Sequence, residues 1–162
     1  MTLRASEYAH DGFELASDGV LNERRNGERA LRRTILLVED DPFVRAATCS
    51  ILKHAGFDVL PAEDACAAMK VYEECARTID LVMTDMVLPG RNGQELGRDL
   101  RERSAEVVVL VTSGYFNPEY EIEEAESRTY FLAKPYSRRT LLEKIEKILG
   151  TTALAHRATQ AG

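Results

Sequence analysis

The sequence contains no tryptophan, little cysteine and proline, and no long apolar run. Of its 162 residues, none is Trp, three are Cys and five are Pro. Because no apolar stretch reaches the length of roughly 18 residues that a membrane helix needs, we expect no contact with a membrane. The N-terminus also lacks the basic-then-apolar pattern of a secretory signal. These absences favour a cytoplasmic protein.

The three cysteines, Cys49, Cys66 and Cys75, do not have the spacing of a zinc site. Their odd number, without an export signal, indicates reduced thiols rather than a disulfide framework. The formal net charge of -6 disfavours binding to the phosphate backbone of nucleic acids. We therefore expect no direct DNA binding.

Apolar runs alternate with longer segments of helical spacing through most of the chain. The runs predict strands over 34–38, 57–60, 80–84, 107–112 and 129–133. The first helix should begin with Asp41 as its cap and Pro42 in its first position, and Gly56 should follow its end. One face of this helix is predicted to carry Val44, Ala47, Thr48, Ile51, Leu52 and Ala55. Further helices are expected near 64–77, near 93–103, from Asn117, and from Ser137 to about Leu149, with Gly150 ending the last.

Five strands that alternate with five helices predict an α/β domain with a parallel sheet over 33–150. Residues 1–32 mix charges and scattered apolar residues without a clear period, which indicates an extension, linker or docking arm. Residues 151–162 are interpreted as a C-terminal tail. In such a sheet the ligand site lies at the carboxyl ends of the strands.

Charged and hydroxyl side chains stand at those strand ends. Glu39 and Asp40 follow the first strand, Asp85 the third, and Lys134 the fifth. Thr112 and Ser113 end the fourth strand. Two or three carboxylates facing one point suit Mg²⁺, and a carboxylate beside Mg²⁺ can accept a phosphoryl group. The metal, the ammonium and the hydroxyl can then hold the phosphoryl oxygens.

Four motifs, "LLVEDDP", "TDMVLPGRNG", "VTSG" and "FLAKPY", resemble in order and separation the receiver domain of two-component response regulators. The resemblance covers roughly 33–150. It implies a flavodoxin-like doubly wound (βα)5 fold with strand order 2-1-3-4-5. It also implies a phosphoprotein of a two-component system or phosphorelay, a signalling switch rather than a conventional enzyme. Such a domain catalyses its own phosphorylation and dephosphorylation.

The resemblance also assigns roles to individual residues. Asp85 matches the phosphoacceptor, Thr112 the hydroxyl that grips the phosphoryl group, and Lys134 its counter-cation. The implied Mg²⁺ ligands are Asp40, Asp85 and the backbone carbonyl of Val87, with Glu39 acting mainly through water. Phe131 falls at the switch aromatic, although plain core packing stays an alternative there. Pro135 matches a proline that usually follows a cis bond, and Val87 and Gly114 flank the expected path of attacking water.

The implied phosphodonor is a histidine kinase or histidine phosphotransfer protein, and the implied output is a downstream protein partner or a homodimer. No effector domain is visible, since the 12 residues after Gly150 are too few for a DNA-binding domain. A receiver of a hybrid histidine kinase is an open alternative. A non-phosphorylated interaction module is disfavoured because Glu39, Asp40, Asp85 and Lys134 are all present. A dehalogenase-like phosphatase would carry Asp-x-Asp at the first strand, where this chain has "VEDDP".

Overall fold

The computed structural model describes residues 32–114 and 128–160. The predicted N-terminal extension, apart from its last residue, and the predicted helix from Asn117 lie outside these ranges. The described residues belong to one compact unit, Arg32–Gly162. In the described part of the chain, no helix has the length and hydropathy needed to cross a bilayer.

A five-stranded sheet with the order β2-β1-β3-β6-β7 forms the centre of the domain, and every neighbouring pair in it is parallel. This is the predicted flavodoxin-like winding, because β4 and β5 form a separate hairpin. The strands are β1 (Thr34–Val38), β2 (Asp58–Ala62), β3 (Ile79–Asp85), β6 (Val109–Ser113) and β7 (Thr129–Ala133). The first and last of these strands along the chain, β1 and β7, have the predicted bounds, and the bounds of the other three differ from the prediction by one or two residues.

Pro61 lies inside β2, beyond the predicted end of that strand. Proline cannot donate to a strand ladder, so it is confined to edge strands and strand ends. Because β2 is at the edge of the sheet, its outer side needs no donor from Pro61.

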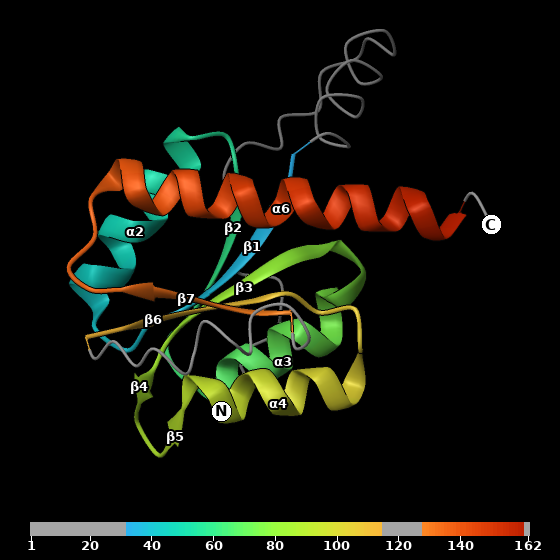
Figure 1. The fold of residues 1–162 in the computed structure, drawn as a ribbon. Coiled ribbons are helices and arrows are strands. Elements are labelled where there is room, and N and C mark those ends of the chain that lie inside the picture. Colours follow the sequence, from blue (N-terminus) through green and yellow to red (C-terminus); the bar gives the residue numbers. More distant parts are fainter. Residues whose placement is uncertain (1–31, 115–127, 161–162) are drawn as a thin grey trace, which may run out of the picture. The chain divides into compact units, whose positions relative to one another are not determined.

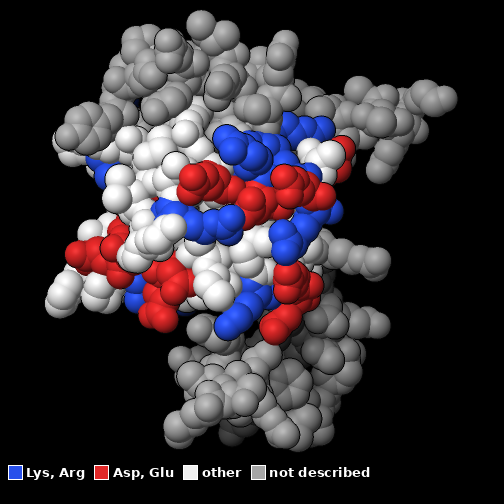
Figure 2. Space-filling view, turned by 90° about the horizontal axis from the view of Figure 1, so that it is seen from below, with Lys and Arg blue, Asp and Glu red and all other residues white. Residues whose placement is uncertain are grey.

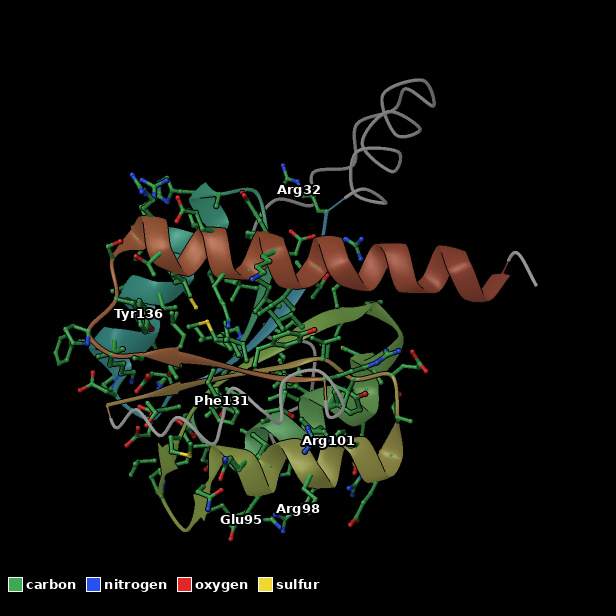
Figure 3. All side chains as sticks on the ribbon, in the orientation of Figure 1. Arg32, Glu95, Arg98, Arg101, Phe131 and Tyr136 are labelled. Atoms are coloured by element: carbon green, nitrogen blue, oxygen red, sulfur yellow. The ribbon has the colours of Figure 1, made fainter. Side chains whose placement is uncertain are left out.

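Helices of the described residues cover both faces of the sheet (Figure 1). On one face lie α2 (Pro42–His54) and α6 (Arg138–Gln160), and on the other lie α3 (Ala65–Cys75) and α4 (Gly93–Arg103). Each face has its own apolar cluster. Tyr136 packs against the α2–α6 cluster and Phe131 against the α3–α4 cluster, so the two rings lie on opposite sides of the sheet (Figure 3).

Helix α2 begins as predicted, but its buried face is narrower than the sequence indicates. The side chain of Asp41 accepts hydrogen bonds from the amides of Phe43 and Val44, at 2.8 and 3.0 Å. Thr48 and Leu52 are buried. Val44 is 39% exposed, and Ala47 and Ala55 are also exposed. Only part of the predicted apolar face is therefore buried.

The predicted end of the last helix at Gly150 is also wrong, since α6 continues to Gln160. A glycine ends a helix by adopting positive φ. Positive φ occurs at Gly56, which follows α2 as predicted, and at Gly90, but not at Gly150. The residues after Gly150 include Ala153, Leu154 and Ala155, which are strong helix formers.

The second predicted helix is shorter than expected: α3 ends at Cys75 and a short 3-10 turn, η2 (Ala76–Thr78), follows it. After β3 the chain forms the small antiparallel hairpin of β4 (Val87–Leu88) and β5 (Arg91–Asn92), which the sequence did not predict. Seen from the side of α3 and α4, the surface carries both signs of charge in close alternation (Figure 2). One of the ion pairs joins Arg91 of β5 to Asp99 of α4.

Candidate functional site

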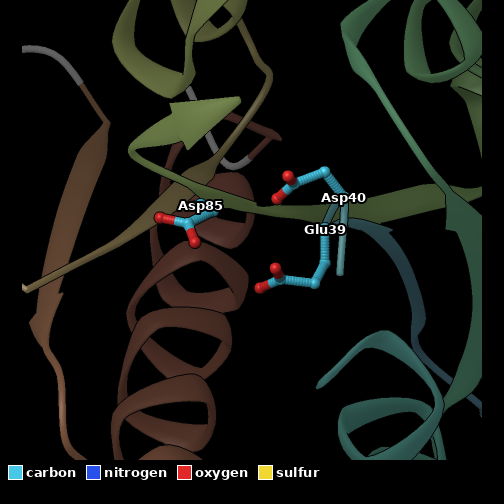
Figure 4. Close-up of side chains that lie close together, drawn as sticks. All are labelled: Glu39, Asp40 and Asp85. Atoms are coloured by element: carbon cyan, nitrogen blue, oxygen red, sulfur yellow. The ribbon is translucent and has the colours of Figure 1, made fainter. Parts of the chain in front are cut away.

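Three carboxylates gather at the carboxyl ends of β1 and β3. Glu39 and Asp40 directly follow β1, and Asp85 is the last residue of β3. One carboxylate oxygen from each residue lies within 4.8 Å of the other two. Figure 4 shows the side chains of Glu39 and Asp40 on one side of the cluster and Asp85 on the other. The structure thus brings together the three acidic residues that the sequence analysis selected.

Lys134 enters this cluster from the end of β7. Its ammonium donates a hydrogen bond to Oδ2 of Asp85 at 2.6 Å, and it lies 3.5 Å from Oε2 of Glu39. All three side chains are at least partly shielded from water, with 28% of Lys134, 16% of Asp85 and 8% of Glu39 exposed. One ammonium among three carboxylates leaves an excess of negative charge, which favours a further cation.

The protonation equilibria reflect this crowding. Burial raises the pKa of Glu39, Lys134 opposes that rise, and the charge of Asp85 adds to it. For Lys134, burial alone would lower the pKa, but the hydrogen bond and the charge of Asp85 outweigh it, so the pKa is raised. The ammonium is therefore held in its charged form, while the ionised form of Glu39 is disfavoured.

Thr112 stands directly beside Asp85 in the sheet. The two residues are paired in the parallel register of β3 and β6, in which neighbouring strands are about 4.8 Å apart. The Thr112 side chain is buried, and its hydroxyl donates a long hydrogen bond of 3.4 Å to the carbonyl of Thr84. Ser113 follows it and is also buried. Thr112 is therefore the neighbour of Asp85 in the sheet, and its hydroxyl bonds the carbonyl that precedes Asp85.

Val87, the remaining predicted metal ligand, is the first residue of β4, and its amide donates to Oδ1 of Asp85 at 3.2 Å. This contact keeps the segment after β3 close to the carboxylate cluster. The bond between Lys134 and Pro135 is cis, as the sequence motif indicated. Phe131 is half-buried against the α3–α4 cluster.

Three residues that support the site were missed by the sequence analysis. A Cβ atom on Gly93 would come within 2.2 Å of the backbone oxygen of Asp85, so only glycine allows α4 to start so close to it. Tyr136 packs against the α2–α6 cluster, where burial raises the pKa of its phenol and the side chain of Thr48 opposes that rise. Arg45 donates to the carbonyl of Glu39 at 2.6 Å. The glycine after "GRN" could have been noticed as a close-approach signal, whereas nothing in the spacing reveals the contacts of Tyr136 and Arg45.

Comparison with known proteins agrees with this fold and this set of side chains. The family model described as the response regulator receiver domain matches residues 35–146. The match covers most of the described domain, and the chain therefore belongs to the response regulator receiver family. Receiver domains are components of two-component signal transduction and function as signalling switches.

Several relatives share this domain. "Sensor kinase CckA" of Brucella abortus is 31% identical over 117 residues, covering 72% of this chain and 12% of the relative. "Transcriptional regulatory protein AruR" of Pseudomonas aeruginosa is 40% identical over 81 residues, covering 48% of this chain and 33% of the relative. This chain thus spans one third or less of the length of these two proteins.

Solved structures show the same architecture. The receiver domain of the hybrid histidine kinase CckA is 34% identical, with a TM-score of 0.62 over 72% of this chain and 98% of that one. A receiver domain protein from Clostridium thermocellum has a TM-score of 0.69 over 76% of this chain and 98% of that one. Its 22% identity supports the fold alone.

Proposed function

We propose that this chain is a phosphoacceptor receiver, in which Asp85 takes a phosphoryl group from the phosphohistidine of a histidine kinase or phosphotransfer protein. The observation that carries the proposal is the convergence at Asp85. A hydroxyl from β6, an ammonium that follows β7 and two carboxylates that follow β1 all meet the end of β3. A purely structural ion pair would need neither the excess carboxylates nor the buried hydroxyl.

The acidic cluster fits a divalent cation with oxygen ligands. Three carboxylate oxygens within 4.8 Å of one another match the preference of Mg²⁺ for carboxylates, and the exposed Asp40 leaves room for the waters that the ion retains. Asp40, Asp85 and the carbonyl of Val87 would hold the ion, with Glu39 acting through water. When bound, Mg²⁺ supplies positive charge opposite the developing charge of the phosphoryl oxygens.

In the transfer itself, the protein contributes the attacking carboxylate and the groups that hold the phosphoryl oxygens. An oxygen of the Asp85 carboxylate attacks phosphorus while the bond between phosphorus and the donor imidazole nitrogen breaks, and the bonding electrons return to that nitrogen. Lys134 then exchanges part of its contact with Asp85 for a phosphoryl oxygen, and the hydroxyl of Thr112 donates to another. These groups act by positioning and by electrostatic stabilisation.

The signal would leave the site through the strands that hold these groups. When Thr112 moves toward the phosphoryl group, it leaves the carbonyl of Thr84, and space opens beside β7, where Phe131 can turn inward. The two arrangements form a switch that a local charge biases. A downstream protein, or a second copy of the chain, would read the altered surface.

A second candidate, the receiver of a hybrid histidine kinase, is favoured by one specific observation. Both the sensor kinase CckA of Brucella abortus, at 31% identity, and the receiver domain of the hybrid kinase CckA, at 34%, match this chain over 72% of its length. In that case the phosphoryl group would pass onward to a phosphotransfer protein. The chemistry at Asp85 would be the same.

Phosphotransfer profiling tests the proposal and separates the two candidates. The protein is incubated with a panel of autophosphorylated histidine kinases and phosphorylated phosphotransfer domains, with Mg²⁺, and the label is followed over time. We expect rapid transfer from at least one donor and none to Asp85→Asn. Transfer back to a phosphotransfer domain supports the hybrid-kinase candidate. If no donor and no small phosphodonor labels the protein, the chain is a non-phosphorylated interaction module.

A further inference from the structure

Arg45 connects helix α2 to the loop that carries the acidic pair. Its Nη1 donates to the carbonyl oxygen of Glu39 at 2.6 Å and to that of Asp40 at 3.1 Å. Its backbone amide donates to the carbonyl oxygen of Asp41 at 2.9 Å. The guanidinium therefore binds two consecutive carbonyls of the loop between β1 and α2, whereas the bond to Asp41 is the first backbone bond of the helix.

These contacts provide hydrogen-bond donors for backbone carbonyls that lie beyond the end of β1, outside the hydrogen bonding of the sheet. Beyond β1, the amide of Glu39 still donates to the carbonyl of Ala62, but the loop carbonyls have left the ladder. The half-buried side chain of Arg45 supplies the hydrogen-bond donor that a neighbouring strand would otherwise provide. Within the described residues its guanidinium forms no ion pair with a carboxylate, so its contacts in this region are with the loop backbone.

We propose that Arg45 is a positioning residue for the divalent metal ion: it fixes the peptide planes of the loop so that Glu39 and Asp40 present carboxylates, not carbonyls, to the ion. This inference rests on the proposed function. Turning the two carbonyls toward α2 directs the side chains toward Asp85, whose carboxylate meets theirs within 4.8 Å. The ion then binds a preformed set of oxygens and does not have to order the loop.

Preorganisation distinguishes Mg²⁺ from Ca²⁺. Mg²⁺ demands nearly ideal octahedral geometry, whereas Ca²⁺ accepts varied numbers and positions of oxygen ligands. A loop that loses Arg45 keeps all of its carboxylates but samples more orientations. Mg²⁺ should therefore lose more affinity than Ca²⁺. A residue that only stabilised the fold, or only contributed charge, would change the affinity of both ions by the same factor.

The experiment is titration calorimetry of MgCl₂ and CaCl₂ into the protein, for wild type, Arg45→Met and Arg45→Lys. The control is Arg139→Met, which removes an arginine whose side chain is 86% exposed on α6. We expect Arg45→Met to weaken Mg²⁺ binding by about tenfold or more, since a hydrogen bond from a charged donor contributes that much. Ca²⁺ should weaken several-fold less, and the control should match wild type.

Arg45→Lys keeps the positive charge. If Arg45→Met does not fold, the losses of Mg²⁺ and Ca²⁺ affinity are compared in Arg45→Lys instead. It should also lose more Mg²⁺ than Ca²⁺ affinity, because a single ammonium cannot reproduce the guanidinium geometry. Equal losses for both ions, or no loss, in a folded Arg45 variant would overturn the inference and leave the proposed function intact. If wild type itself binds no Mg²⁺, the proposed metal site is what fails.

Discussion

The ammonium of Lys134 lies 2.6 Å from Asp85 and 3.5 Å from Glu39, so one cation joins residues that end β3 and follow β1. The contact with Asp85 is the shorter of the two, and Asp85 is the residue that we propose to be phosphorylated. Before phosphorylation, Lys134 holds this carboxylate in place. If Asp85 accepts a phosphoryl group as proposed, the same ammonium is in place to bind one of its oxygens, and such preorganisation favours the transfer.

Magnesium should stabilise the folded protein through the acidic cluster. An ion that binds only the folded state adds about 2.7 kcal/mol to the free energy of unfolding at a hundredfold excess over its Kd. Thermal melts with and without MgCl₂ should show a clear rise in Tm for wild type and a much smaller rise for Asp40→Ala. Glu143→Ala, which removes a side chain that is 63% exposed on α6, should respond like wild type. Equal rises in Tm for wild type and Asp40→Ala would show that Asp40 is not a ligand of the metal ion.

Glu39 should make the metal-free protein less stable as the pH rises. Its pKa is raised above 4.5, chiefly by burial, so the folded state binds this proton more tightly than the unfolded state does. The free energy of unfolding therefore falls as the pH rises from the unfolded pKa through the higher folded pKa. Glu39→Gln, which carries no such proton, should gain stability relative to wild type over that range. Urea unfolding in EDTA from about pH 4 to pH 7 measures the difference, and a constant difference would contradict the assignment.

Two glycines should respond in opposite ways to alanine. At Gly93 the added Cβ would lie 2.2 Å from the backbone oxygen of Asp85, so β3 or α4 must shift. Gly93→Ala should cost about 1–3 kcal/mol, as overpacking does, and it should slow phosphorylation because Asp85 moves. At Gly150, inside α6, no atom of the described side chains or backbone lies within 4 Å of the added atom.

Gly150→Ala should therefore stabilise the protein by about 0.5–1 kcal/mol, the usual gain for alanine over glycine inside a helix. Urea unfolding of both variants provides the comparison. A loss of stability at Gly150 would mean that the helix ends there, as the sequence alone indicated.

The phosphorylated state should be comparatively long-lived. By their resemblance to receivers, Val87 and Gly114 are the residues expected to flank the path of the attacking water. Neither has a side chain that can hydrogen-bond a water and orient it for attack. We expect this to slow hydrolysis by about tenfold to a hundredfold, which corresponds to an activation barrier higher by about 1.4–2.7 kcal/mol. Val87 is 73% exposed, and a Cβ at Gly114 would meet no atom of the described residues within 4 Å, so the described structure leaves room for larger side chains at both sites. Val87→Asn combined with Gly114→Glu should lose label faster after the donor is removed. A decay as slow as wild type would show that these positions do not control hydrolysis here.

The sequence predicted the sheet and the acidic site because both depend on local patterns. Apolar runs such as Ile35 to Val38 mark strands whatever their neighbours, and the side chains that follow parallel strands necessarily meet at one edge. The end of α6 was mispredicted because a glycine stops a helix only at positive φ, and the sequence does not reveal the φ of Gly150. The contacts of Arg45 were missed because a long side chain can reach many backbone groups, and only the folded loop shows which carbonyls are available.

The central claim is that Asp85 is the phosphoacceptor, and labelling with a small phosphodonor tests it most directly. Wild type and Asp85→Asn are incubated with acetyl phosphate and Mg²⁺, and the intact masses are measured before and after exposure to alkali. The amide is nearly isosteric with the carboxylate but is a poor nucleophile, so the variant should fold normally. We predict that wild type gains the mass of one phosphoryl group, which alkali removes, and that Asp85→Asn gains none. A folded Asp85→Asn protein that is labelled to the same extent as wild type would contradict the account.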